Sequence, residues 1–234
     1  MSLNQENVYN KIAEDVDPIL LNILKETINK LAKEPHQNLL DVGCGYGKLL
    51  SFFVRFQNCY GVDFSEGPLS KAKSRGINTY RVNLENERIP FQSNFFDLVI
   101  CSQVIEHVLN TDSLLNEINR VLRDKGTLIL TFPNINQPVS WLAQIIFDYP
   151  PMFAARYKST HVRDYTLRIV KKILPIYGFD IYNIRGTCIY PFKSNFSQWL
   201  AKITPRISQR IIVLSLKKRK PEKTLNVVGD LRFF

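Results

Sequence analysis

The sequence contains no apolar run that approaches the roughly 20 residues a membrane-spanning helix needs. Its opening stretch, MSLNQENVYNKIAEDVD, has no basic start followed by apolar residues, so it does not resemble a secretory signal. No internal repeat or low-complexity linker is present either. We therefore expect a cytoplasmic globular protein.

Cysteine and histidine are scarce. The four cysteines form no CxxC pair, which argues against a zinc site and against a disulfide framework. Acidic residues are also few beside basic ones, and the formal net charge is +10. This excess admits an anionic partner, whether nucleic acid, membrane surface or acidic substrate, but a solvated basic surface explains it equally well.

The 234 residues suit a single domain with insertions. Apolar spacing predicts a helical arm over 8–34 that is interrupted only near Pro18. Short apolar runs predict strands over 38–43, 58–63, 78–83, 96–102, 126–132, 179–185 and 210–216. Helical segments are expected between them, over 47–56, 65–75, 111–123 and about 165–177. This alternation predicts an α/β fold with a Rossmann-like, mostly parallel seven-stranded sheet and helices on both faces.

The expected organisation is an N-terminal helical arm (1–35), a cofactor-binding core (36–134), two cap insertions (135–165 and 187–209) and a basic C-terminal tail (217–234). Both insertions are rich in aromatic residues and proline, and both follow strand ends, so they are candidates for an apolar roof over a site. Ordinary packing of a cap explains the same residues. In the second insertion, a helical face formed by Phe196, Trp199, Leu200 and Ile203 is expected to pack against the domain.

The segment LLDVGCGYGKLL, residues 39–50, follows the first predicted strand. Its alternate glycines, Gly43, Gly45 and Gly47, allow a tight turn and close approach of a ligand. A dinucleotide fingerprint, GxGxxG, would need a third glycine where Lys48 stands. The Asp41 carboxylate, two residues before the first glycine, suits a ligand with an ammonium and a sulfonium better than a pyrophosphate.

The second predicted strand ends at Asp63, about 20 residues further along. A carboxylate there can accept hydrogen bonds from both hydroxyls of a ribose. This position is shared with NAD sites, so it indicates a nucleoside without choosing which one.

Four ordered segments, LLDVGCGYG, GVDFS, IPFQSNFFDLVICSQVIEHV and VLRDKGTLILTFPN, together resemble the class I S-adenosylmethionine-dependent methyltransferases, in particular the type 11 group that includes quinone-biosynthesis enzymes. The resemblance covers residues 36–135 well. It implies that the chain is an enzyme with S-adenosylmethionine as cofactor, and that the cofactor's methionine end lies against Asp41, Gly43, Cys44, Gly45 and Gly47.

The same resemblance assigns the ribose to Asp63 and the adenine to Phe64. Asn83, with Leu84 beside it, takes the place where the family often has Asp for the adenine amino group, and its amide oxygen can accept the same bond. Ser102 and Gln103 would border the sulfur.

The acceptor side begins at the run SQVIEHV. His107 is a candidate base, and Glu106 and His161 are further candidates, although a structural role explains each of the three as well. In some quinone O-methyltransferases an acidic residue at the Gln103 position, with the Glu-His pair, is associated with a divalent metal. Gln103 breaks that set here, so no metal is expected.

The predicted function is methyl transfer to the oxygen or carbon of a small acceptor, for which a lipophilic or aromatic molecule would suit the apolar insertions. The basic charge would also suit peripheral contact with an anionic membrane. Two alternatives remain: a cofactor-binding fold that has lost catalysis and serves as an interaction module, and an RNA methyltransferase. No RNA-binding module is recognisable, so nucleic acid is the weaker expectation.

Overall fold

A computed structural model describes residues 17–55, 57–147, 161–218 and 221. Its first described helix, α2, spans Pro18–Leu31. Asp17 caps it by accepting the backbone N–H of Ile19 at 2.8 Å, and proline suits a first helical position because it has no N–H to satisfy. Pro18 therefore begins a helix here, whereas residues 8–16 of the predicted arm lie outside the described residues.

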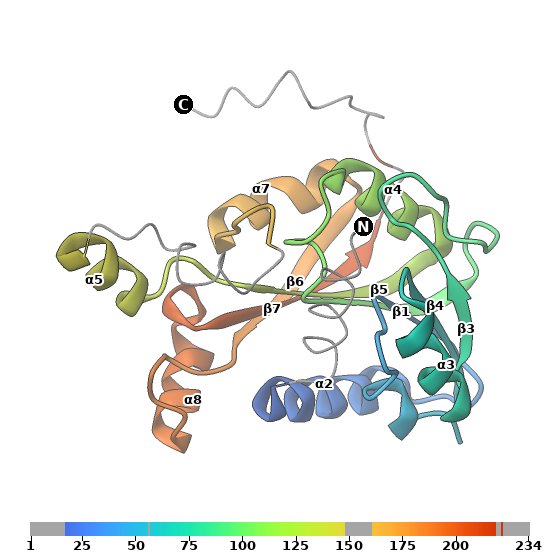
Figure 1. Cartoon of the computed structure of the whole chain (residues 1–234), viewed down its shortest axis with the longest axis horizontal. Coiled ribbons are helices and arrows are strands. Elements are labelled where there is room, and N and C mark those ends of the chain that lie inside the picture. Colours follow the sequence, from blue (N-terminus) through green and yellow to red (C-terminus); the bar gives the residue numbers. More distant parts are fainter. Residues whose placement is uncertain (1–16, 56, 148–160, 219–220, 222–234) are drawn as a thin grey trace.

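The prediction of a seven-stranded, mostly parallel sheet is confirmed (Figure 1). The strand order is β3-β2-β1-β4-β5-β7-β6, and β7 runs antiparallel to both of its neighbours. The strands span Asn38–Val42 (β1), Asn58–Asp63 (β2), Asn78–Arg81 (β3), Phe96–Ser102 (β4), Leu122–Pro133 (β5), Phe179–Gly186 (β6) and Arg210–Lys217 (β7).

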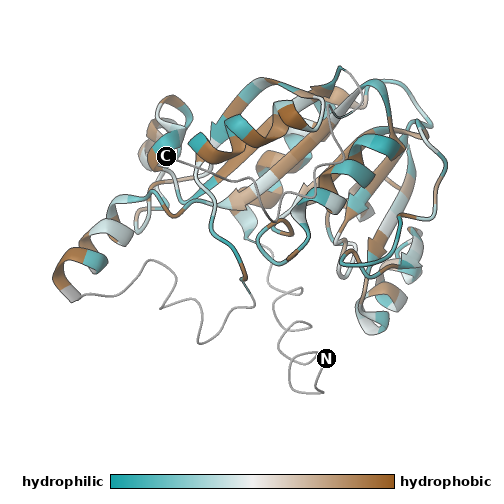
Figure 2. Cartoon of the chain, turned by 90° about the horizontal axis from the view of Figure 1, so that it is seen from above, coloured by the Kyte–Doolittle hydropathy of each residue, from teal (hydrophilic) through white to brown (hydrophobic). Residues whose placement is uncertain are grey.

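Helices cover both faces of the sheet, and each face has its own apolar core. Helices α4 (Thr111–Val121) and α7 (Leu167–Ile176) bury leucine, isoleucine and valine side chains on one face. Helix α2 and α3 (Glu66–Ser74) pack on the other. Figure 1 shows α4 and α7 above the sheet and α2 below it, and Figure 2 shows hydrophobic residues along the strands. This three-layer arrangement leaves the ends of the strands as the place for a site.

The predicted helix over 47–56 is wrong. Among residues 47–55, which the structure describes, only Leu50–Phe52 forms a helical turn, of the 3₁₀ type (η1). The backbone there mixes α-helical hydrogen bonds, from the N–H of residue i to the carbonyl of i−4, with 3₁₀ hydrogen bonds, which reach i−3. Ser51 N–H to Gly47 O is of the first type and Phe53 N–H to Leu50 O is of the second. The adjacent aromatic residues and Val54 have low helix propensity, so nothing local enforces a regular ladder.

Both insertions contain helices. These are α5 (Pro138–Phe147) in the first, and α8 (Asn195–Ile203) with the 3₁₀ turn η2 (Pro205–Ile207) in the second. The face of α8 that we expected to pack inward is exposed, which corrects the prediction from periodicity: Phe196, Trp199 and Ile203 point to solvent, and Ser197 and Ala201 are buried.

The start of the predicted basic tail also needs correction. Lys217 is buried as the last residue of β7, and its ammonium donates to the carbonyl oxygen of Leu122 at 2.7 Å and to Asn94 Oδ1 at 2.8 Å. Residues 219–220 and 222–234 lie outside the described ranges. Among the residues that are described, no helix combines the length and the apolar character needed to cross a bilayer.

Candidate functional site

A cavity of about 380 Å³ lies at the carboxyl ends of β1, β2 and β4, within the size range of small-molecule sites. Its wall carries most of the residues that the sequence assigns to a cofactor and acceptor: Asp41, Gly43, Cys44, Gly45, Asp63, Ser102, Gln103, Glu106, His107 and His161. Helix α2 closes one side with leucine side chains. The strand ends thus bring together residues that lie up to 120 positions apart in the sequence.

The glycine turn after β1 has the conformation that its glycines predict. Gly43, Gly45 and Gly47 have φ angles of 73°, 48° and 67°, in the left-handed region that favours glycine. Space is a second constraint, because a Cβ on Gly43 would come within 2.3 Å of a Val104 methyl. Gly47 does not line the cavity; a Cβ there would meet Ile77 at 2.4 Å. Gly47 therefore serves packing behind the turn.

Asp63, at the end of β2, is fixed by the turn beside it. Its two carboxylate oxygens accept the backbone N–H groups of Gly45 at 2.9 Å and of Ser65 at 3.0 Å. Each carboxylate oxygen can accept more than one hydrogen bond, so capacity remains for a ligand. The carboxylate is held in one orientation at the cavity wall before any ligand arrives.

Two buried carboxyl groups face the same cavity. Burial and the neighbouring Asp63 raise the pKa of Asp41 to about 8. Burial also raises the pKa of Asp63, although backbone N–H groups from Ser65 and Gly45 oppose that rise. A cation bound beside these two carboxyl groups would lower their pKa, because its positive charge stabilises the ionised carboxylates. This end of the cavity thus suits a positively charged ligand.

Three residues assigned to the adenine lie outside the cavity lining. Phe64 has its carbonyl bound by Arg81 Nε at 3.1 Å. Asn83 Oδ1 accepts the N–H of Glu85 at 3.1 Å in a turn, and Leu84 packs against the core. Their contacts with a cofactor stay predictions. Cys44, by contrast, does line the cavity, and its buried sulfur also fills the space over Gly61.

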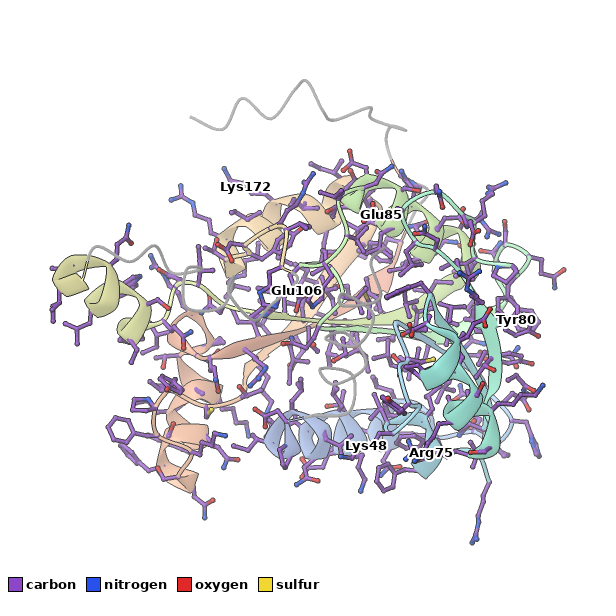
Figure 3. All side chains as sticks on the ribbon, in the orientation of Figure 1. Lys48, Arg75, Tyr80, Glu85, Glu106 and Lys172 are labelled. Atoms are coloured by element: carbon purple, nitrogen blue, oxygen red, sulfur yellow. The ribbon has the colours of Figure 1, made fainter. Side chains whose placement is uncertain are left out.

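The acceptor candidates Glu106, His107 and His161 come together in the wall of the same cavity. The rings of His107 and His161 have their centroids 4.7 Å apart. The carbonyl oxygen of Glu106 accepts the backbone N–H groups of Val162 and Arg163, at 2.8 and 3.2 Å, and so anchors the segment that carries His161. Figure 3 labels Glu106 in the middle of the molecule. Backbone contacts, invisible in the sequence, thus create this cluster.

The electrostatics of this cluster are unusual for its residue types. Burial raises the pKa of Glu106 to about 8, although its own backbone N–H and the charge of Arg210 lower it. Burial and the neighbouring His107 lower the pKa of His161 to about 4. Within the described part of the chain, Glu106 Oε2 is buried without a hydrogen-bond partner. At neutral pH His161 is uncharged, and Glu106 is close to the point where it gains or loses a proton.

The cluster can also be judged as a metal centre. One ligand atom from each of Glu106, His107 and His161 lies within 4.8 Å of the others, and a carboxylate with two imidazoles suits several divalent cations. Gln103, the residue on which the expectation of no metal depends, is not part of this set. The expectation that no metal binds here therefore stays a prediction. The oxygen and nitrogen atoms of the cluster could hold a proton between them or coordinate a cation.

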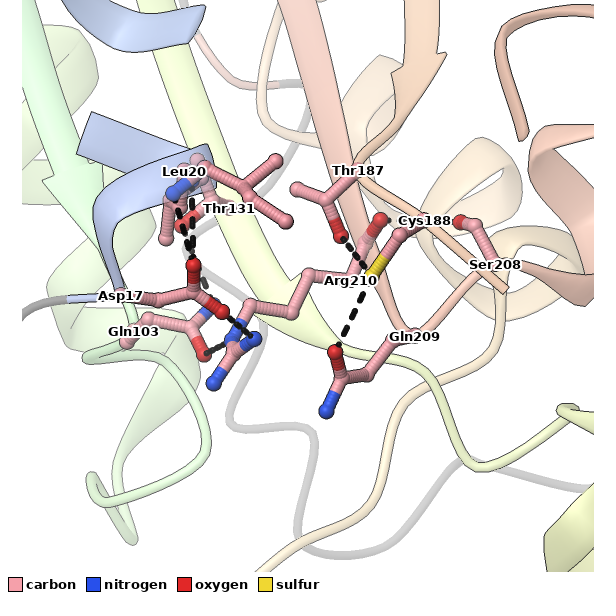
Figure 4. Close-up of polar contacts among 10 residues, drawn as sticks. Asp17, Leu20, Gln103, Thr131, Thr187, Cys188, Ser208, Gln209 and Arg210 are labelled. Atoms are coloured by element: carbon pink, nitrogen blue, oxygen red, sulfur yellow. Dashed lines mark hydrogen bonds and ion pairs between the residues drawn. The ribbon is translucent and has the colours of Figure 1, made fainter. Parts of the chain in front are cut away.

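Gln103 is instead part of a polar link that the sequence did not predict (Figure 4). Its side chain donates to Thr131 Oγ1 at 3.1 Å and accepts from Arg210 Nε at 3.2 Å, and Arg210 also pairs with Asp17. Asp17 and Arg210 both line the cavity. The isolated charge at the start of the apolar run RIIVLSL was the only available signal for Arg210. The link ties the start of α2 to β7 beside the acceptor cluster.

Comparison with known proteins follows the same lines. Residues 40–130 match the family model described as a methyltransferase domain. A ubiquinone biosynthesis O-methyltransferase of Dechloromonas aromatica is 32% identical over 142 residues, which are 58% of this chain and 59% of that protein. An uncharacterised protein of Methanocaldococcus jannaschii is 27% identical over 86% of this chain and 90% of its own length. The chain spans about three fifths of the first curated relatives that it matches.

Solved structures agree on the fold. An S-adenosylmethionine-dependent methyltransferase from Mesorhizobium loti superposes with a TM-score of 0.61 at 16% identity, covering 83% of this chain and 96% of the other. Magnesium protoporphyrin IX methyltransferase from Synechocystis superposes with a TM-score of 0.62 at 18% identity, covering 85% of this chain and 82% of the other. With the cavity and the glycine turn, these findings show the fold of the S-adenosylmethionine-dependent methyltransferases and a segment, residues 40–130, that is similar to a methyltransferase domain.

Proposed function

We propose that the protein methylates a hydroxyl oxygen of a small aromatic or lipophilic acceptor. S-adenosylmethionine is the proposed methyl donor, and the observation that carries the proposal is the cluster of Glu106, His107 and His161 in the wall of the cavity that Asp41 and Asp63 also line. Methyl transfer from a sulfonium is an in-line displacement, and a base is needed only where the acceptor must lose a proton. A cluster of groups that can take up a proton favours a hydroxyl acceptor over one that needs no base.

The chain's residues then divide into two sets. Asp41 and Asp63 hold the cationic cofactor, the first by charge and the second through the ribose hydroxyls. His107 accepts the acceptor's proton, and His161, uncharged at neutral pH, packs edge-on to its ring and holds it in place. Glu106, once ionised, stabilises the protonated His107 that results. Alignment of acceptor and sulfonium within the cavity can supply about 7 to 11 kcal/mol of the barrier reduction.

The comparisons support oxygen as the methylated atom. Two curated relatives are named ubiquinone biosynthesis O-methyltransferase, and the residues that match the methyltransferase-domain model, 40–130, contain the glycine turn and the Glu-His pair. The cavity wall offers leucine side chains of α2 to an apolar acceptor. The aromatic residues expected to roof the site do not add to this support, because none of Trp141, Tyr190, Phe192 and Trp199 lines the cavity.

The test is transfer of labelled methyl from S-adenosylmethionine to phenols and catechols with and without alkyl chains, with transfer RNA as a separate acceptor. We expect His107→Gln to lower kcat by about 10²- to 10⁴-fold, the usual contribution of a positioned base. Cofactor affinity should be unchanged, because His107 is assigned to the acceptor. His36→Gln, at an exposed histidine before β1, is the matched control and should keep full activity.

Three results would contradict the proposal: methyl transfer to transfer RNA and to no phenol, a product methylated on carbon, or an unchanged kcat in His107→Gln. Tight cofactor binding with no turnover on any acceptor would instead favour the interaction module.

A further inference from the structure

We propose that α8 and the loop before it form a surface that docks on an anionic lipid bilayer. The α8 surface consists of Tyr190, Phe192, Phe196, Trp199 and Ile203, whose exposed fractions are 42, 67, 69, 55 and 57%. Five large apolar side chains within 14 consecutive residues are more than the scattered exposure that is normal for a soluble surface. The proposal goes beyond methyl transfer and does not depend on the acceptor.

The orientation of α8 is fixed by close packing of small residues. Its Ala201 carbonyl and Ser208 lie so near β6 that a Cβ on Gly186 would come within 2.7 and 2.5 Å of them. Ser197 Oγ accepts the N–H of Ile189 at 2.8 Å and donates to the carbonyl of Phe192 at 2.6 Å. Only small side chains fit at this contact, so the aromatic side must face outward.

The charge of this segment identifies the partner. Residues 187–209 contain Lys193, Lys202 and Arg206 and no acidic residue. All three basic side chains are exposed, and Lys193 and Lys202 flank the stacked pair of Phe196 and Trp199, whose ring centroids are 5.8 Å apart. Aromatic rings at the headgroup level with lysine and arginine beside them are the features of helices that lie in the interface of anionic membranes.

Other occupants fit less well. A second copy of the chain would bring the same basic residues against each other in a two-fold contact, and like charges oppose such pairing. Helix α5 also exposes apolar side chains, but it ends at Phe147, beside residues 148–160 that lie outside the described ranges, so it is left out of the surface.

The α8 surface lies close along the chain to the cavity. Gln209 and Arg210 come one residue after the end of η2 and line the cavity, and Gln209 Oε1 accepts from the Cys188 thiol at 3.3 Å. In Figure 1, α8 extends from the sheet on the side where α2 lies. Docking through α8 would therefore hold the rim that carries Arg210 near the bilayer, where a lipophilic acceptor is concentrated.

The test is sedimentation of the full chain with vesicles of phosphatidylcholine alone or mixed with phosphatidylglycerol. We expect binding to the mixed vesicles only, weakened by salt. Phe196→Ser with Trp199→Ser should lower vesicle affinity by about tenfold or more, since buried apolar area contributes much of such binding. Lys193→Gln with Lys202→Gln should reduce the preference for phosphatidylglycerol. Leu109→Ser, an equally exposed apolar residue before α4, is the control.

A second readout follows insertion directly. The chain has two tryptophans, so Trp141→Phe leaves Trp199 as the sole reporter. Its emission should shift to the blue and be quenched by brominated lipid when vesicles are added, while cofactor binding stays unchanged. The proposal is overturned if the protein ignores mixed vesicles, if the serine variant binds them equally well, if Trp199 emission is already blue-shifted without lipid, or if sedimentation velocity shows a dimer that the serine variant abolishes.

Discussion

Asp41 lies in the part of the cavity that is assigned to the cofactor, where its carboxyl group can interact with a cation. Its position two residues before a glycine turn was enough to assign it to a cation, because the end of a buried parallel strand opens onto the ligand site. The sequence could not predict that burial and Asp63 would raise its pKa to about 8. Asp17 and Arg210 were missed altogether, because their ion pair joins positions 193 residues apart.

The raised pKa of Asp41 predicts a pH-dependent stability. The folded protein without cofactor holds a proton on Asp41 that the unfolded chain releases near pH 3.8, the ordinary pKa of an aspartate. Stability from this group is therefore complete below about pH 4 and falls as pH rises to about 8, by at most about 1.4 kcal/mol per pH unit. Asp41→Asn removes this dependence, so the free energy of unfolding should decline less with pH in the variant. Urea unfolding from pH 5 to 8 measures the difference; parallel curves would contradict the assignment.

Elements were predicted unequally, for physical reasons. The central strands β1, β4 and β5 contain continuous apolar runs because they are buried on both faces, whereas the edge strands β3 and β6 are exposed or half-buried over most of their length. All seven strands lie near their predicted positions. The helix predicted over 47–56 was wrong because the glycine turn is followed by a 3₁₀ turn. For α8, periodicity showed which residues share a face and could not show which face is buried. That depended on Gly186 and Ser208, which admit only small neighbours.

The glycine turn gives a prediction at this scale. Gly47→Ala should lower the free energy of unfolding by about 1 to 3 kcal/mol, because φ is 67° and the new Cβ would meet Ile77 at 2.4 Å. Gly67→Ala is the matched control: it lies in α3 with open space around the new Cβ, and should be neutral or stabilising by up to about 1 kcal/mol. Chemical denaturation compares the two. Equal effects would show that the turn imposes no special constraint.

At the scale of the molecule, the cavity at the carboxyl ends of the strands is lined by two chemically different groups of residues. The group of Asp41 and Asp63 comes from the first two strands and suits a cationic cofactor, and the group of Glu106, His107 and His161 suits an acceptor that loses a proton. The first group was predictable because its residues follow strand ends in ordered motifs. The second was predicted only as separate candidates, since the backbone contacts of Glu106 with Val162 and Arg163 bring His161 to it.

Calorimetric binding of S-adenosylmethionine and of NAD to the wild type, Asp63→Asn and Asp63→Ala tests most directly whether the cavity binds S-adenosylmethionine through Asp63. We predict that S-adenosylmethionine binds and that NAD does not. Asp63→Ala should weaken cofactor binding by about 10- to 150-fold, from the loss of a charge-assisted hydrogen bond of about 1.5 to 3 kcal/mol. Asp63→Asn keeps one acceptor for Gly45 or Ser65 and should lie between. Undiminished affinity in a folded Asp63→Ala variant, or tighter binding of NAD, would contradict the account.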